Sequence, residues 1–238
     1  MDEQCRFFAG LTDRDFLDRA YEREIVIGDF ATVGRDFENL LRNTHAFLLD
    51  LDNRISDDLF VFRSGIACRR SVLYAEAKCE ILWDNVWKMH NQERGTVYLR
   101  GLQKHSTRVE AILERIADAF PKKKLFANLF ISPPSAVGLK AHFDPTDFFI
   151  LQISGRKEWH FWPAPERGQA EAMMPEEVGR YCGEIQTTQP PYREVILEAG
   201  QVMYVPLHMI HAPITRDDPS THVTLGLAAP ELRNRIKD

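Results

Sequence analysis

The sequence predicts a mainly β protein with flanking helices, in which short strands close into a jelly-roll barrel. Beyond Leu125 the hydrophobic pattern changes from helical spacing to a succession of short apolar runs, rich in β-branched and aromatic residues. Short strands at this spacing are typical of a sandwich or jelly-roll barrel. Turn residues separate the runs: Gly138, Gly155, Gly200 and the pair Pro133-Pro134.

The chain is long enough for one sizeable core. It has 238 residues, of which 44% are hydrophobic, and β barrels of this length are commonly single domains. We expect one barrel over residues 95–238 and an N-terminal α/β support region, residues 1–94, packed on it.

The N-terminal third has a mixed helix and strand pattern. Residues 11–22 predict a helix that begins at Thr12 as N-cap, with Phe16, Leu17, Ala20 and Tyr21 facing inward. Residues 24–30 predict a strand and residues 37–49 a second helix. Short β-branched and aromatic runs predict strands within residues 60–75 and 95–100.

The clearest helix runs from Thr107 to Phe120. Thr107 and Glu110 fit a capping box, and Pro121 ends the helix. The apolar positions at helical spacing are Val109, Ile112, Leu113, Ile116 and Phe120. The strands expected after this helix are residues 125–132, 148–154, 157–163, 194–199, 202–206, 210–214 and 222–227.

Composition argues against several classes of protein. The net charge of -5 disfavours a nucleic-acid binder, and the basic runs Arg69-Arg70 and Lys122–Lys124 are typical of solvated surface. No apolar stretch is long enough for a membrane span, and the acidic start is unlike a secretion signal. The four cysteines lie far apart and predict reduced thiols, so we expect a cytoplasmic protein.

A candidate metal site lies in the segment AHFDP, residues 141–145. In extended chain His142 and Asp144 point the same way and could share one ion. Two histidines and one carboxylate on one face suit an iron that must leave positions open for other ligands. The alternative is a surface histidine beside an aspartate that starts a turn, because so short a pattern also arises by chance.

A third ligand is available in residues 200–213, GQVMYVPLHMIHAP. His208 and His211 are three residues apart, so in extended chain they face opposite ways and only one should reach the metal. Spacing alone does not choose between them. His211 begins the expected strand 210–214, whereas His208 sits in the bend before it.

Residues 142–159, HFDPTDFFILQISGRKEW, followed by YVP and a histidine five residues after that proline, resemble the JmjC-type, cupin-like Fe(II)- and 2-oxoglutarate-dependent oxygenases. The likeness is closest to the ribosomal-oxygenase branch and covers residues 128–227 well. It implies a double-stranded β-helix with His142, Asp144 and His211 on the iron. His208 then takes the place usually held by a turn glycine.

The resemblance also implies a site for 2-oxoglutarate. The family's basic residue, fifteen positions after the first metal histidine, matches Lys157, which we place in a hairpin turn. An ammonium facing the far carboxylate makes a charge-assisted hydrogen bond. Asn128 matches an asparagine fourteen positions before that histidine, and Thr224 is the candidate hydroxyl on the last core strand. The alternatives are a structural buried amide and an ordinary strand threonine.

The implied activity is that of a dioxygenase that hydroxylates an amino-acid side chain in a peptide or protein. The alternatives are a hydroxylase of a small molecule and a non-catalytic cupin-like binding protein. A cupin sugar isomerase fits less well, because it uses more histidines and a glutamate. The chain ends about eleven residues after Leu227, so we expect no C-terminal winged-helix region of the ribosomal-oxygenase kind, and the oligomeric state stays open.

Overall fold

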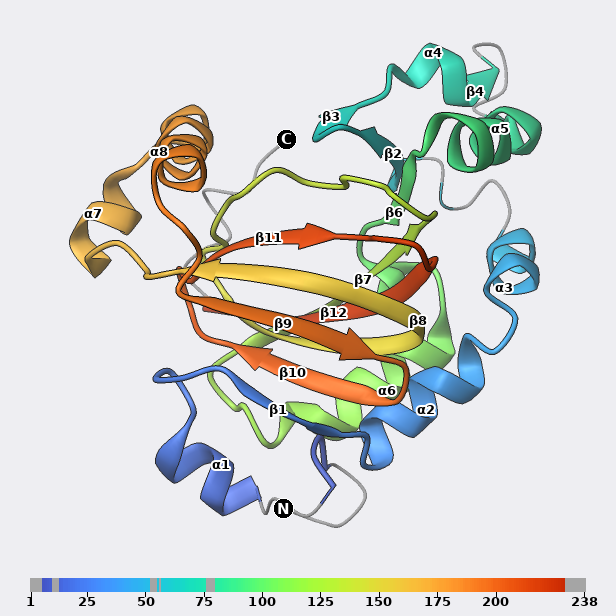
Figure 1. Ribbon diagram of the computed structural model, residues 1–238. Helices are drawn as coiled ribbons and strands as arrows, with labels where there is room; N and C mark the ends of the chain where they lie inside the picture. The colour runs from blue at the N-terminus through green and yellow to red at the C-terminus, as the bar shows by residue number, and fades with distance from the viewer. Residues whose placement is uncertain (1–5, 10–12, 52–54, 56, 76–79, 230–238) are drawn as a thin grey trace.

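A computed structural model describes residues 6–9, 13–51, 55, 57–75 and 80–229 (Figure 1). Its helices are α1 (Asp13–Arg19), α2 (Thr32–Leu40), α3 (Thr44–Leu51), α4 (Arg70–Leu73), α5 (Trp83–Glu93), the 3-10 helix η3 (Leu102–Lys104), α6 (Thr107–Ala117), α7 (Arg167–Ala172) and α8 (Pro175–Thr188). Its strands are β1 (Val26–Asp29), β2 (Leu59–Arg63), β3 (Ile66–Ala67), β4 (Tyr74–Ala75), β5 (Glu80–Ile81), β6 (Thr96–Leu99), β7 (Lys124–Ser132), β8 (Asp147–Trp162), β9 (Arg193–Glu198), β10 (Gln201–Val205), β11 (Ile210–Ile214) and β12 (Ser220–Ala228).

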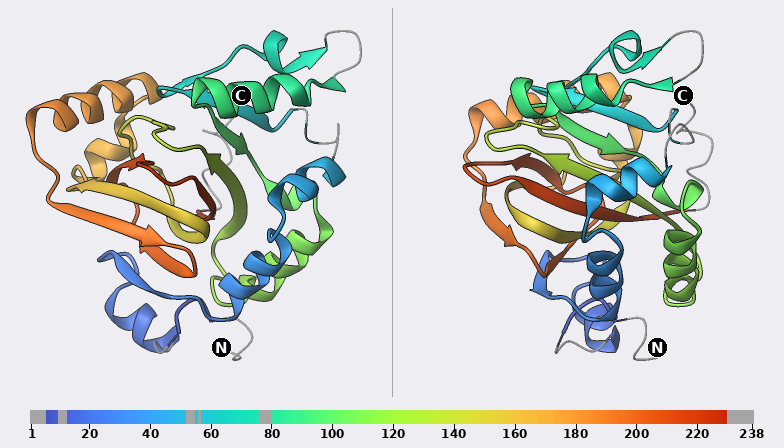
Figure 2. Two further views of the ribbon diagram at one scale, coloured as in Figure 1. Left: turned by 45° about the vertical axis from the view of Figure 1, so that its right-hand side comes forward. Right: turned by 90° about the vertical axis from the view of Figure 1, so that its right-hand side faces the viewer.

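Ten of the described strands form a barrel-like sheet that is built around β8, while β4 and β5 pair with each other. The first half of β8 pairs with β10 and β12, and the sheet continues from β12 through β7 and β6 to β2 and β3. The second half of β8 pairs with β9 and β11. All of these pairings are antiparallel, and Figure 2 shows the two layers curving around a common interior.

Gly155 allows β8 to take part in both layers. Its φ is +63°, and a Cβ at this position would lie 1.8 Å from the carbonyl oxygen of Pro219. Only glycine combines easy access to positive φ with the absence of that atom. The strand therefore bends at Gly155 without ending, so the two expected strands 148–154 and 157–163 are one strand, and the hairpin turn predicted around Lys157 is wrong.

Helices cover the outer face of the large sheet. α2 and α6 lie beside β8 and β7, below the barrel in Figure 1. The apolar face of α6 is buried as its spacing predicts, with Val109, Leu113 and Ile116 inside. Aromatic rings fill the space between the N-terminal segment and the sheet, and Phe7 stacks on Phe149 at 3.9 Å between ring centroids. Such contacts tie the N-terminal third to the barrel.

Several predicted elements are confirmed. Helix α1 buries Phe16, and Ala20, which follows its last residue, is also buried, as expected; the expected cap, Thr12, lies outside the described residues. β1 is the strand expected over residues 24–30, and β7, β9, β10, β11 and β12 match the remaining expected strands within two residues. Residues 60–75 form β2, β3 and β4 but also the helix α4.

Other details of the helices differ from the predictions. The helix expected over residues 37–49 is two helices, because Asn43 interrupts it: its side-chain oxygen accepts the backbone N–H of Ala46, as an N-cap does. The capping box at Thr107 is wrong, since Ser106 is the N-cap of α6 and its Oγ accepts the backbone N–H of Val109. The helices α5, α7 and α8 were not predicted from the sequence.

Two further observations bear on the class of protein. Within the described part of the chain, no helix has both the length and the apolar character that a membrane crossing requires. Cys68 and Cys182 are free thiols, and Cys5 and Cys79 lie outside the described residues.

We predict that Gly155→Ala lowers the free energy of unfolding by at least about 3 kcal/mol, because the new methyl group meets a backbone oxygen at a positive φ. Gly179→Ala is the control: it lies within α8, nothing stands within 4 Å of its Cβ, and it should stabilise by about 0.5–1 kcal/mol. Urea denaturation of both variants measures the difference, and equal stability of the two would contradict the role of Gly155.

Candidate metal and cosubstrate site

The interior of the barrel holds a cavity of about 580 Å³. Strands β6, β7, β8, β11 and β12 contribute to its wall. The residues that line it are Phe62, Thr96, Tyr98, Arg100, Gly101, Gln103, Lys104, Phe126, Asn128, Phe130, Gly138, Leu139, His142, Asp144, Pro145, Thr146, Phe148, Lys157, Trp159, His211, Pro213, His222 and Thr224. All six residues singled out in the sequence as site residues are among them, so the fold brings them to one space.

His142, Asp144 and His211 form a cluster on the wall of this cavity. One ligand atom from each lies within 4.8 Å of the others, and the Asp144 carboxylate is 3.8 Å from Nε2 of His211. His211 lies on β11, and His142 lies beside it through two reciprocal backbone hydrogen bonds of 3.1 and 2.8 Å. His142 and Asp144 stand in an extended loop before β8 and not in a strand.

Backbone carbonyls fix which ring nitrogen of each histidine faces the cluster. Nδ1 of His142 contacts the carbonyl of Lys140 at 2.7 Å, and Nδ1 of His211 contacts that of Met209 at 2.9 Å. A carbonyl can only accept, so each Nδ1 carries the proton and each Nε2 keeps its lone pair for a metal. Burial, with a smaller contribution from His142, lowers the pKa of His211 to about 4, which keeps its ring neutral at pH 7.

His208 is held away from the cluster by its backbone. Its φ is +62°, in the left-handed region that favours glycine, and its ring packs against Phe143 at 5.5 Å. It does not line the cavity. Its backbone N–H donates to the carbonyl of Asp144 at 3.2 Å, so the bend steadies the cluster without contributing a ligand.

Lys157 carries a buried amino group that has no carboxylate partner among the described residues. Its side chain is 2% exposed, and Nζ donates to Oγ of Ser132 at 2.8 Å. Ser132 also accepts from Thr96, at 3.0 Å. No carboxylate in the described part of the chain lies within ion-pair distance of Nζ. Burial alone lowers the pKa of Lys157 to about 7, because no nearby carboxylate offsets the cost of burying the charged form.

Arg156, next to Lys157, points the other way. It is exposed and pairs with Asp218 at 2.6 Å, as the alternation of a strand predicts. Asn128 and Thr224 face each other across β7 and β12 as Cα partners. The side-chain oxygen of Asn128 accepts the backbone N–H of Gly101 at 2.9 Å, so the structural role considered for this amide is present in addition to its place on the cavity wall.

Three polar residues around Lys157 were not predicted from the sequence to belong to the site: Ser132, Thr96 and His222. His222 is 2% exposed, stacks on Phe130 at 4.8 Å, and its Nδ1 has no hydrogen-bond partner among the described residues. An unpartnered polar atom in a buried site costs free energy unless a ligand or water satisfies it. Alternation along β12 was the one available signal, because His222 and Thr224 share a face.

Asp147, at the start of β8, also escaped notice. It is fully buried, and its Oδ1 accepts from the hydroxyl of Tyr204 at 2.7 Å and from the backbone N–H of Leu207 at 3.2 Å. Its Oδ2 accepts from Lys123 at 3.1 Å. This network fixes the start of β8 against β10, three residues after Asp144, and so positions the cluster.

The fold and the cavity define a class of protein: a cupin-like double-stranded β-helix with a His-Asp-His cluster inside the barrel. A model of the JmjC domain matches residues 102–235, more than half of the chain. The chain belongs to the JmjC family, and the predicted mainly β fold with flanking helices is confirmed.

Curated relatives support the same family. The bifunctional lysine-specific demethylase and histidyl-hydroxylase NO66 of Drosophila sechellia is 28% identical over 179 residues, which are 75% of this chain and 26% of that protein. NO66 of Dictyostelium discoideum is 31% identical over 148 residues, 59% of this chain and 26% of that protein. The chain thus spans about a quarter of the length of these relatives.

Solved structures share the fold at low sequence identity. The ribosomal oxygenase YcfD of Escherichia coli, in complex with cobalt and succinic acid, aligns with a TM-score of 0.60 and 14% identity over 94% of this chain and 53% of that chain. YcfD with cobalt and 2-oxoglutarate aligns with a TM-score of 0.58 and 15% identity, over 94% and 54%. These structures confirm the fold, while the membership of the JmjC family rests on the family match and the curated relatives.

We predict that Lys157→Met stabilises the ligand-free protein. The folded pKa of about 7 lies below the ordinary 10.5, so the unfolded chain binds more protons and wild-type stability is lost as pH falls from about 10.5 towards 7. At pH 7 the variant should be more stable by on the order of 1–3 kcal/mol, and this gain should shrink at higher pH. Urea denaturation at several pH values measures it, with the exposed Lys122→Met as control. If the variant were less stable than wild type at pH 7, the conclusion that Lys157 is buried without a counter-ion would be refuted.

Proposed function

We propose that the protein is an Fe(II)- and 2-oxoglutarate-dependent oxygenase that hydroxylates an amino-acid side chain in a peptide or protein. One observation carries the proposal: a His-Asp-His cluster and a buried, unpaired lysine line the same cavity. To bind 2-oxoglutarate, a cavity needs a metal for the keto acid end and a cation for the far carboxylate. The cluster and the lysine meet these two needs.

His142, Asp144 and His211 are the proposed iron ligands. Two neutral imidazoles and one carboxylate suit Fe(II) in a site that keeps positions open for other ligands, and both Nε2 atoms are available because both Nδ1 atoms are engaged. When bound, iron with 2-oxoglutarate and O2 supplies the oxidising power to hydroxylate a C–H bond, with release of succinate and CO2.

Lys157, Asn128 and Thr224 are the proposed residues for 2-oxoglutarate. Lys157 supplies the charge that the dicarboxylate needs, while Ser132 holds its Nζ in place at 2.8 Å. The amide nitrogen of Asn128 and the hydroxyl of Thr224 complete the polar wall, and Nδ1 of His222 offers a further unpartnered atom. These groups orient the cosubstrate, and the surrounding aromatic rings exclude water.

The remaining parts of the protein support the site. Phe148 and Trp159 pack near the His211 ring, at 5.1 and 6.0 Å between centroids, and help to keep it in position. We propose that residues 1–94 act as a support for the barrel of residues 95–238, because β1 pairs with β10 and β2 pairs with β6. A peptide or protein substrate is favoured by the names of the relatives, which denote demethylase, histidyl-hydroxylase and ribosomal-oxygenase activities.

We predict that Asp144→Ala and His211→Ala each weaken Fe(II) binding by about 100-fold or more and abolish succinate formation, because each removes one of three ligands. His208→Asn is the matched control, since asparagine tolerates the left-handed backbone of residue 208. Anaerobic titration with Fe(II) and a succinate assay measure both effects. Normal metal binding by His211→Ala, or its loss in His208→Asn, would refute the ligand assignment.

We predict that Lys157→Met raises the 2-oxoglutarate concentration needed for half-saturation by about 10- to 100-fold, the range for losing a charge-assisted hydrogen bond. Wild-type binding at pH 8 should also take up a proton, because Lys157 with a pKa of about 7 is mostly neutral in the free site and charged in the complex. Calorimetry in two buffers of different ionisation enthalpy measures the uptake. It should persist in Arg156→Gln and vanish in Lys157→Met; uptake in both would contradict the role of Lys157.

A further inference from the structure

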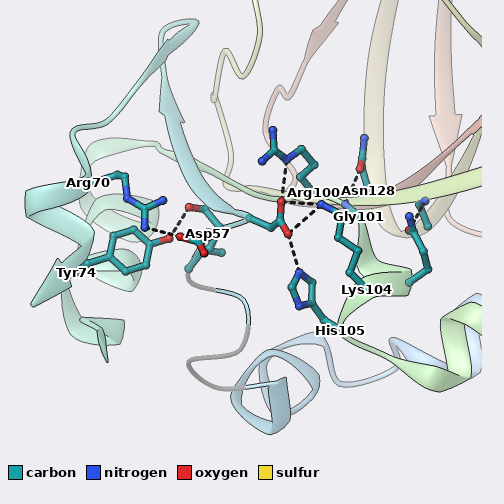
Figure 3. Close-up of polar contacts among 12 residues, drawn as sticks. Asp57, Arg70, Tyr74, Arg100, Gly101, Lys104, His105 and Asn128 are labelled. Atoms are coloured by element: carbon teal, nitrogen blue, oxygen red, sulfur yellow. Dashed lines mark hydrogen bonds and ion pairs between the residues drawn. The ribbon is translucent and has the colours of Figure 1, made fainter. Parts of the chain in front are cut away.

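A second group of cations borders the cavity, gathered around one buried carboxylate. Oδ1 of Asp58 accepts from Nε of Arg100 at 2.8 Å, both of its oxygens accept from Nζ of Lys104 at 3.2 Å, and Oδ2 contacts Nε2 of His105 at 2.9 Å. These four residues are called the Asp58 cluster. Figure 3 shows Arg100, Lys104 and His105 reaching towards one point from a short segment, residues 100–105, which includes η3.

The fold holds this segment in place from two sides. Leu59 and Leu99 are partners in the register of β2 and β6, and just beyond them the backbone N–H of Arg100 donates to the carbonyl of Asp58 at 2.9 Å. On the other side, Asn128 accepts the N–H of Gly101, as Figure 3 shows. The cluster is therefore rigidly placed beside the proposed cosubstrate site.

The Asp58 cluster carries an excess of positive charge. Burial alone would raise the pKa of Asp58, but hydrogen bonds from Arg100, His105 and Lys104 outweigh it and lower that pKa, so the carboxylate is ionised. One negative charge thus faces the two cations Arg100 and Lys104. Their side chains are 48% and 53% exposed, whereas that of Asp58 is 7% exposed.

Arg100, which lines the cavity, keeps donors available. Asp58 engages only its Nε, and the guanidinium lies over the Phe60 ring at 5.5 Å from the centroid, which fixes its plane. Its two terminal NH2 groups have no partner among the described residues. A planar guanidinium with free terminal donors suits a carboxylate, which it can bind through two parallel hydrogen bonds.

We propose that Arg100 and Lys104 bind a carboxylate of the substrate, and that the substrate is therefore an acidic peptide. The cavity is lined by four formally charged residues, Arg100, Lys104, Asp144 and Lys157. If the proposed function holds, iron and 2-oxoglutarate engage the last two, which leaves only cations to meet the substrate. A basic peptide would face uncompensated like charge, and an acidic one finds complementary charge.

The test is calorimetric titration of the whole chain, loaded with Fe(II) and 2-oxoglutarate without oxygen, with three probes: a tetraglutamate peptide, a tetralysine peptide and N-acetylglutamate. We expect tetraglutamate to bind at least about tenfold more tightly than the other two and its affinity to fall with added salt. Arg100→Gln and Lys104→Gln keep a donor for Asp58 but lose the charge, and each should weaken tetraglutamate binding by about tenfold. Arg100→Lys should retain most of the preference. Arg156→Gln, which loses an exposed cation outside the cavity, is the control and should bind as wild type does.

Each alternative result is decisive. Equal binding of both peptides, no binding of either, or unchanged tetraglutamate affinity in the double variant Arg100→Gln/Lys104→Gln would overturn the proposal. N-acetylglutamate binding as tightly as tetraglutamate would support the anion site and overturn its assignment to a peptide. The titration needs no turnover. If the protein converts 2-oxoglutarate but does not prefer tetraglutamate over tetralysine, only this proposal is overturned. Absent conversion of 2-oxoglutarate overturns the proposed function instead.

Discussion

The structure depends on the continuity of β8 through Gly155. One strand of 16 residues supplies pairing partners to β10 and β12 with its first half and to β9 and β11 with its second. The bend lets those four strands curve around one interior, because a straight strand could not belong to both layers. Asp144 lies just before β8, His211 lies on a strand that pairs with its far half, and Lys157 follows the bend by two residues. The geometry of the site thus depends on Gly155, because the surrounding backbone leaves no room for a side chain at this position.

The burial of Lys157 lowers the stability of the protein, and we interpret it as an adaptation to bind a ligand. An ammonium taken out of water without a counter-ion costs free energy, and neither Ser132 nor Thr96 supplies the missing charge. An anion that enters the cavity gains what the folded chain lacks, since its attraction to Lys157 acts in a medium of low polarity. Functional sites commonly trade stability for binding in this manner, and the unpartnered Nδ1 of His222 is a second instance in the same wall.

Arg100 and Lys104 represent a different use of positive charge. They are half exposed and share the counter-ion Asp58, so solvent screens them and their folded-state cost is small. Charges of this kind contribute more to the choice of partner than to raw affinity. The same cavity therefore combines a deep cation that requires a ligand with outer cations that select one, and Asn128 links the two regions through its contact with Gly101.

The sequence by itself determined the local features of this protein: the strand pattern after Leu125, the buried face of α6, and the offset between His142 and Lys157, because periodicity and spacing are properties of neighbouring residues. The likeness to known oxygenases supplied the choice of His211, which spacing had left open. The tertiary structure explains this choice, because His208 has a left-handed backbone conformation in the bend and stays away from the cluster. It also decided that two expected strands are one, and it brought Ser132 to Lys157 and Asp58 to Arg100. Those contacts join residues 25 and 42 positions apart, and no local pattern encodes which distant segments will meet.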